Sequence, residues 1–227
     1  MKSLLSATWS LLQKEIRVEL RTGEIVVTTA LFATLVAVLT SLAFYIDARS
    51  AARVGPGVLW IAITFGGVLA MSRSWSRERD NDVFRALLLS PVPRAAIYFS
   101  KVLATLAFLC VIEVILLIEV MVLFNLDLGG GKLGPLCALM AMGTFGFAVT
   151  GNLFAAFGVR TSARDMMLAV IVLPVVAPAL LSGVVATREL IGGAPLAEVY
   201  GWMLVLGAFD LGFLAAGFVL FETLLVE

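Results

Sequence analysis

Residues 25–46 read IVVTTALFATLVAVLTSLAFYI, a stretch without a single charged side chain. An α-helix needs roughly 20 consecutive apolar residues to cross the hydrocarbon core of a bilayer. The hydrophobic region of a secretory signal peptide is shorter, about 7–15 residues. The residues before position 25 are polar and charged in helical alternation, which does not match a signal peptide. We therefore predict a membrane-spanning helix at 25–46 and no cleavable signal peptide before it.

Five further apolar runs follow along the chain. They cover residues 54–72, 102–126, 133–159, 166–187 and 199–221. Apolar residues make up 61% of the chain, charged residues only 14%, and the mean hydropathy is +1.07. Soluble domains carry about 45–50% apolar and about 25% charged residues, so one soluble core cannot hide this composition. We predict an all-α membrane protein in which residues 25–227 form a six-helix transmembrane domain.

The basic residues are divided unevenly between the two ends of the predicted bundle. Six spans place both termini and the segments 73–101 and 160–165 on the same side. Twelve Lys and Arg residues lie on that side and four on the other. Because loops rich in Lys and Arg stay in the cytoplasm, we predict that the N- and C-termini are cytoplasmic. The net charge is zero, so the composition gives no reason to expect nucleic acid as a partner.

Residues 1–24 form a separate segment before the first span. Its apolar residues recur at helical spacing, and its basic residues take other faces of the same helix. The apolar set is Leu5, Trp9, Leu12, Ile16 and Leu20, and the basic set is Lys2, Lys14, Arg17 and Arg21. An amphipathic helix of this composition lies in the headgroup plane of the membrane. We predict such an interfacial helix in contact with lipid; a plain cytoplasmic tail is the alternative.

The segment 73–101 is the longest and most charged of the predicted cytoplasmic segments. Residues 76–82 are polar enough to leave the membrane, and residues 83–89 could form a short helix. Pro91 and Pro93 would end that helix, because proline has no amide donor and restrains the residue before it. A charged helix with an apolar patch suits the groove of a partner protein. A solvated loop that holds positive charge inside the cell fits the pattern equally well.

Short motifs in order along the chain carry a resemblance to a known family. They are GPGVLWIA at 55–62, RERDND at 77–82, LLLSPVP at 87–93 and VLPVVAPA at 172–179, followed by Ala186-Thr187. With these motifs the chain resembles the haem exporter protein B (CcmB) family, which are ABC-transporter permeases of cytochrome c maturation. Each motif alone is weak, but their order and spacing extend through nearly the whole chain.

The resemblance implies a type 2 exporter-like permease in the bacterial inner membrane, with a coupling helix between spans two and three. It also implies a separate cytoplasmic ATPase subunit (CcmA-like), a second permease copy in a homodimer, a haem-handling membrane protein and a haem chaperone. The expected ATPase-coupling residues are Arg77, Glu78, Asp82, Phe84, Arg85, Leu88, Pro91 and Pro93.

The chain itself lacks the motifs of an ATPase. A phosphate-binding loop reads GxxxxGK[ST], and the nearest match, Gly129-Gly-Gly-Lys132, is followed by Leu133 and lacks the first glycine. There is no histidine, which excludes Ser-His and Cys-His nucleophile pairs, HExxH zinc sites and histidine ligation of haem by this chain. We therefore expect a non-catalytic subunit without catalytic or metal-binding residues. ATP-Mg should bind to the partner ATPase, and haem should be handled by partner proteins.

Three carboxyl groups fall inside the predicted spans, namely Glu113, Glu119 and Asp210. Ionisable groups are costly at that depth, so each suggests either a role in transport or a hydrogen bond to a neighbouring helix. A proton-coupled secondary transporter using Glu113 or Asp210 is the alternative to the ABC permease. Glu113 and Glu119 lie about 240° apart around a helix and should face different neighbours.

Other features of the spans concern packing. Pro174 and Pro178 should kink the fifth span, since freed backbone carbonyl groups must then face protein. Ala208, Gly212 and Ala216 form a stripe of small residues on the sixth span that would allow close helix packing. Cys110 and Cys137 should be small buried apolar residues without a disulfide bond.

Overall fold

The computed structural model describes residues 4–44, 48–80, 89–126, 128–158 and 164–224. In these ranges the chain forms helices and no strands. They are α1 (Leu4–Thr22), α2 (Glu24–Ala43), α3 (Ala48–Asp80), α5 (Arg94–Leu123), α6 (Leu133–Gly158), α7 (Arg164–Gly192) and α8 (Leu196–Leu224). Six of these helices, all except α1, are long and apolar enough to cross a membrane. The predicted all-α fold with six spans is therefore confirmed.

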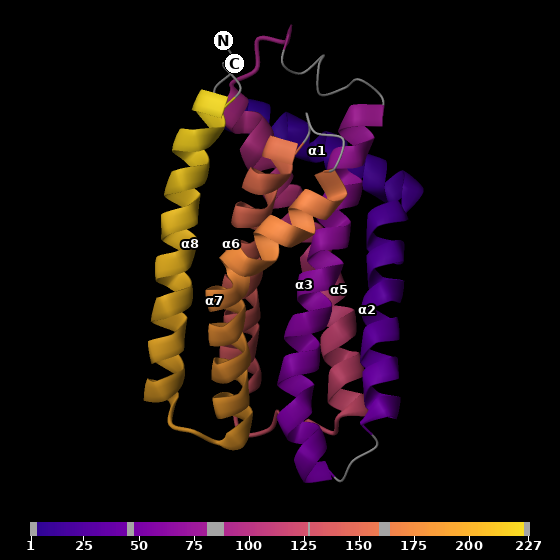
Figure 1. Cartoon of the computed structure of the whole chain (residues 1–227), viewed down its shortest axis with the longest axis vertical. Coiled ribbons are helices and arrows are strands. Elements are labelled where there is room, and N and C mark those ends of the chain that lie inside the picture. The colour runs from indigo at the N-terminus through magenta and orange to yellow at the C-terminus, as the bar shows by residue number, and fades with distance from the viewer. Residues whose placement is uncertain (1–3, 45–47, 81–88, 127, 159–163, 225–227) are drawn as a thin grey trace.

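The six long helices run along one axis, and α1 lies across one end of the bundle (Figure 1). The last turn of α3, the first turn of α5 and the last turn of α8 are at this same end, here called the α1 end. The sharp turn from α1 into α2 occurs at Gly23, whose φ of +62° is a left-handed conformation that glycine adopts without strain. Glu19 supports the turn because its carboxylate accepts a hydrogen bond of 2.8 Å from the amide of Val26.

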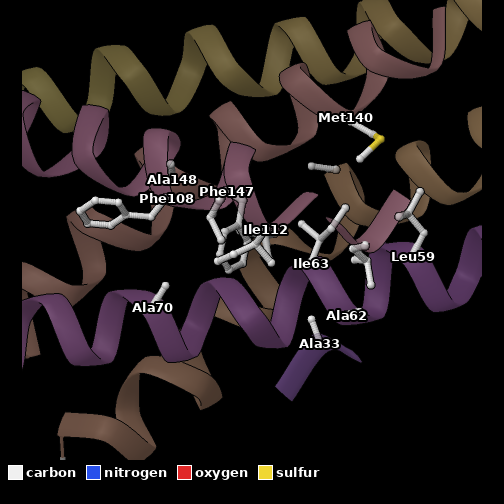
Figure 2. Close-up of a cluster of buried hydrophobic side chains, with 14 of the residues drawn as sticks. Ala33, Leu59, Ala62, Ile63, Ala70, Phe108, Ile112, Met140, Phe147 and Ala148 are labelled. Carbon is white, nitrogen blue, oxygen red and sulfur yellow. The ribbon is translucent and has the colours of Figure 1, made fainter. Parts of the chain in front are cut away.

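Close contact between α3 and α6 depends on glycines that face large side chains. A Cβ atom added to Gly143 would lie 2.3 Å from the ring of Trp60, and one on Gly67 would lie 2.2 Å from the ring of Phe147. A Cβ on Gly151 would lie 2.3 Å from the sulfur of Met71. Phe147 belongs to the buried core that α3, α5 and α6 share, which is drawn in Figure 2.

Helix α7 changes direction along its length, with an inclined first part and a more upright second part (Figure 1). Pro174 and Pro178 lie inside this helix. A proline inside a helix removes one backbone hydrogen bond and clashes with the preceding turn, which bends the helix. The carbonyl of Pro178 accepts a hydrogen bond of 2.8 Å from the hydroxyl of Ser182. That these two prolines cause the bend remains a prediction.

Two packing expectations are wrong. Ala208 and Gly212 are exposed on the surface of α8, whereas Ala216 is partly buried, so most of the stripe of small residues does not pack against the described part of the chain. Helix α8 instead approaches its neighbours through Gly217, where an added Cβ would lie 2.3 Å from the hydroxyl of Tyr98. Cys110 and Cys137 are free and exposed, because both fall on the outer faces of their helices. Sequence periodicity alone did not reveal which face of each apolar helix points outward.

Candidate functional site at the α1 end of the bundle

The predicted coupling residues fall at and between the ends of α3 and α5. Arg77 and Glu78 belong to α3, which continues to Asp80 rather than ending near position 72. Pro91 and Pro93 directly precede α5, and the carbonyl of Pro93 accepts a 2.9 Å hydrogen bond from the amide of Ala96. The other four predicted residues, Asp82, Phe84, Arg85 and Leu88, lie outside the described residues, as does most of the short helix expected at 83–89.

Two lysines and two glutamates from three helices meet at the α1 end and form what we call the charge cluster. Its members are Lys14 and Glu15 of α1, Glu78 of α3 and Lys101 of α5. The ammonium group of Lys101 lies 3.0 Å from a carboxylate oxygen of Glu15 and 3.0 Å from one of Glu78. The ammonium group of Lys14 lies 3.1 Å from the same oxygen of Glu15 and 2.5 Å from that of Glu78. Each lysine therefore bridges the two carboxylates, and the formal charges balance.

Lys101 is the most buried member of the cluster, with 2% of its surface exposed. Its ammonium nitrogen also donates hydrogen bonds of 3.2 Å to both the carbonyl oxygen and the hydroxyl oxygen of Ser74. Its ammonium group sits 5.7 Å from the ring centroid of Trp75, a favourable cation–π distance. Removing one partner of a buried ion pair typically costs on the order of 3–5 kcal/mol, because a charge is left buried and uncompensated.

Lys14 closes the cluster on its more open side, with 37% of its side chain exposed. Burial alone would lower the pKa of Lys14, but the carboxylates of Glu15 and Glu78 outweigh it and hold the pKa above its ordinary value of 10.5. Since the folded-state pKa is the higher one, this pairing stabilises the fold fully below about pH 10 and is lost only as the pH rises through the folded-state value. The pairing is therefore intact at physiological pH.

A second set of ion pairs joins α3 to the turn between α1 and α2. The guanidinium group of Arg77 lies 2.9 Å from Glu19 and 3.3 Å from Glu24. Arg73 lies 3.1 Å from the other oxygen of Glu24. Thr22 contributes its hydroxyl oxygen, 3.1 Å from Arg77. Two consecutive turns of α3 therefore hold the chain where it leaves α1 and enters the bundle.

Buried hydrogen bonds connect the charge cluster to the interior of the bundle. The indole N–H of Trp75 donates to the amide oxygen of Asn152 at 2.9 Å, and the amide nitrogen of Asn152 donates to Thr105 at 3.0 Å. These residues come from α3, α6 and α5 respectively. Because buried polar groups are costly when unpaired, this chain of hydrogen bonds fixes the three helices relative to one another.

The structure shows which face of α1 meets the protein, a face that the sequence analysis did not assign. Its buried residues are Ala7, Thr8, Leu12, Glu15 and Glu19. Three apolar residues of the stripe predicted to face lipid are largely exposed: Leu5 at 81%, Trp9 at 60% and Leu20 at 82%. The sequence offered a weak signal, since Thr8, Leu12, Glu15 and Glu19 themselves follow helical spacing. The burial of Glu15 and Glu19 could not be predicted locally, because their partners Lys101 and Arg77 lie far along the chain.

The three intramembrane carboxyl groups face different partners. Glu113 is buried and accepts a hydrogen bond from Thr144 of α6. Glu119 accepts a 2.7 Å hydrogen bond from Thr34 of α2, so the prediction that the two glutamates face different helices is confirmed. Asp210 of α8 is 6% exposed and lies against α6, where a Cβ on Gly146 would come within 2.1 Å of its carboxylate. Any role of these groups in transport remains a prediction.

The fold and the site define a six-span helical membrane protein in which an N-terminal amphipathic helix is ion-paired to the helices that flank one connecting segment. The CcmB protein family matches residues 6–223, so this chain belongs to the CcmB family.

Two of three similar proteins match over most of the chain, and the third matches over less than half of it. Heme exporter protein B of Bradyrhizobium diazoefficiens is 26% identical over 189 residues, which cover 83% of this chain and 84% of the relative. Heme exporter protein B of Pseudomonas aeruginosa is 26% identical over 203 residues, or 88% and 89% of the two chains. The protein of the same name from Escherichia coli K12 is 27% identical over 96 residues, or 42% of this chain and 44% of the relative.

Proposed function

We propose that this chain is the membrane permease subunit of an ABC-type haem exporter that serves cytochrome c maturation. The family match over residues 6–223 carries the proposal, and the relatives named Heme exporter protein B support it. The six spans give the chain the form of a permease. Since the sequence carries no phosphate-binding loop, ATP with Mg²⁺ binds a separate cytoplasmic ATPase, and haem is handled by partner proteins.

In this proposal the α1 end faces the cytoplasm of a bacterium, and the chain lies in its inner membrane. Most basic residues belong to segments at that end, which agrees with the tendency of Lys and Arg to stay inside. The segment between α3 and α5 is then available to the ATPase. A half-size permease of six spans works as a homodimer with two ATPase subunits, next to a haem-handling membrane protein and a haem chaperone.

In the proposed mechanism, movement of the ATPase subunits is transmitted to the spans through the cytoplasmic ends of α3 and α5. Closure of the ATPase pair displaces the segment 76–93, which includes the end of α3 at Asp80 and leads into α5 at Arg94. Both helices continue from that segment into the membrane, and Trp75, Asn152 and Thr105 couple them to α6. Helices packed without large voids move as units, so a displacement at the segment changes the arrangement of the spans.

Substitution in the segment tests this assignment. Phe84→Asp and Leu88→Asp should abolish co-purification of the ATPase, at least tenfold below wild type, because a charged group cannot enter an apolar groove of the partner. Membrane insertion should stay unchanged, since the segment lies between two spans that are already complete. Leu88→Met is the matched control and should retain the ATPase.

Normal recovery of the ATPase with both Asp variants would show that the segment is not the docking site. Recovery of no ATPase with the wild-type chain would contradict the permease proposal itself.

A further inference from the structure

The way in which α1 is held to the bundle differs from that expected of an ordinary interfacial helix. The side of α1 that faces protein carries Glu15 and Glu19, while Leu5, Trp9 and Leu20 point away from it. An interfacial helix held by lipid alone needs only its apolar face and its basic residues. The buried carboxylates therefore indicate a specific docking of α1 onto basic residues of α3 and α5.

The docking partners of α1 lie next to the segment proposed to contact the ATPase. Glu78 is two residues before Asp80, the last residue of α3, and Lys101 is in the second turn of α5, which begins at Arg94. Contacts of 3.0 Å join Lys101 both to Glu78 and to Glu15. A shift of either helix end therefore displaces α1 or breaks buried ion pairs.

In the charge cluster, α1 adds ion pairs to the one that joins α3 directly to α5. Glu78 and Lys101 already join α3 to α5. Docking of α1 places Glu15 on Lys101 and Lys14 on Glu78, so that each charge has two opposite neighbours. With one member removed, the other three no longer sum to zero charge in a buried site, which is unfavourable for the docked state.

We propose that Lys101 is a positioning residue of the coupling apparatus: through Glu15 and Glu78 it fixes α1 to the end of α3 and the start of α5, so that α1 and these two helix ends move as one unit. The role of Lys101 in coupling rests on the proposed function, but the docking of α1 can be measured on the permease alone. It assigns α1 a mechanical role that contact with lipid does not require.

The test combines single and charge-balanced substitutions. Lys101→Met leaves two glutamates against Lys14, whereas the double variant Lys101→Met with Glu78→Gln restores neutrality with the Lys14–Glu15 pair. Lys101→Arg keeps the charge, and Glu15→Gln removes the negative charge of α1 that pairs with Lys101 and Lys14. Arg17→Met is the matched control, because Arg17 is an exposed basic residue of α1 outside the charge cluster.

Two readouts separate docking from coupling. Hydrogen exchange of α1 amides in the purified permease should rise at least tenfold in Lys101→Met, less in Glu15→Gln and in the double variant, whose remaining Lys14–Glu15 pair lies within α1, and little in Lys101→Arg and Arg17→Met. In cells, Lys101→Met should still bring down the ATPase but lower the yield of holocytochrome c at least fivefold, with partial recovery in the double variant.

Each outcome has a defined meaning. Unchanged exchange of α1 in both Lys101→Met and Glu15→Gln would show that the cluster does not hold α1. Faster exchange with a normal yield of holocytochrome c would show that α1 is docked but does not take part in coupling. If Lys101→Met does not fold, the exchange of α1 and the yield of holocytochrome c in Glu15→Gln decide the two questions. Absence of the ATPase from the wild-type complex would overturn the proposed function while the exchange data still decide the docking.

Discussion

At the residue scale, Trp60 shows how single glycines determine the packing of this bundle. Its indole N–H donates a 3.0 Å hydrogen bond to Thr187 of α7, and the side chain is 1% exposed. Gly143 of α6 and Gly183 of α7 enclose the ring, since Cβ atoms there would lie 2.3 and 2.6 Å from it. Both α6 and α7 therefore approach the ring closely.

Gly143→Ala should therefore destabilise the protein by about 1–3 kcal/mol, the usual cost of overpacking a tight site. Gly212→Ala is the matched control, because nothing lies within 4 Å of a Cβ at this exposed position. The control should be neutral or stabilising by up to about 1 kcal/mol, since alanine favours a helix more than glycine does. Unfolding of both variants in mixed micelles measures the difference, and equal stability would contradict the enclosed ring.

At the element scale, α1 has three distinct faces. One carries Glu15 and Glu19 and meets the bundle, the next exposes apolar side chains such as Trp9, and the third carries Arg17 and Arg21. Exposed apolar residues beside basic ones suit the boundary between acyl chains and headgroups. The helix is thus held by ion pairs on one side and, in our interpretation, by lipid on the other.

Fluorescence of Trp9 measures the position of α1 relative to the membrane. The difference between the wild type and Trp9→Phe in vesicles isolates this tryptophan from the other three, of which Trp60 and Trp75 are buried and Trp202 is partly buried. We expect this component to be quenched more by lipids brominated near the headgroup than by lipids brominated at the chain end or by aqueous iodide. Strong quenching by iodide with none by brominated lipid would instead favour the cytoplasmic tail.

At the scale of the whole molecule, the two ends of the helix bundle differ in the charged groups that they carry. The α1 end collects the charge cluster and the ion pairs of Arg73 and Arg77. The opposite end has the short connection between α7 and α8, where Lys132 donates a 3.0 Å hydrogen bond to the carbonyl of Ile191. This polarity agrees with an α1 end that faces the cytoplasm.

Cysteine labelling tests the orientation. In a background with Cys110→Ser and Cys137→Ser, Glu198→Cys at the start of α8 should react with a membrane-impermeant maleimide in intact spheroplasts. Ser10→Cys on the exposed side of α1 should react only after permeabilisation. Labelling in the reverse pattern would place the segment 81–88 outside the cell and exclude an ATPase as its partner.

The sequence determined the number of spans and their approximate positions, because the thickness of the bilayer sets how many apolar residues a helix needs. It placed the end of the second span near position 72, whereas α3 continues to Asp80 and includes Arg77 and Glu78. The motifs were sufficient to indicate the family. Each of these conclusions depends on neighbours in the chain, which a sequence displays directly.

Only the tertiary structure decided which charges meet and which faces are buried. Lys14 and Glu78 are 64 residues apart, and no local pattern marks them as partners. Nor does periodicity tell that Gly143 accommodates Trp60 while Gly212 faces outward, since both occur in uniformly apolar helices. In a helix that is apolar on every side, the inner face is chosen by contacts with other helices, and those exist only after the chain has folded.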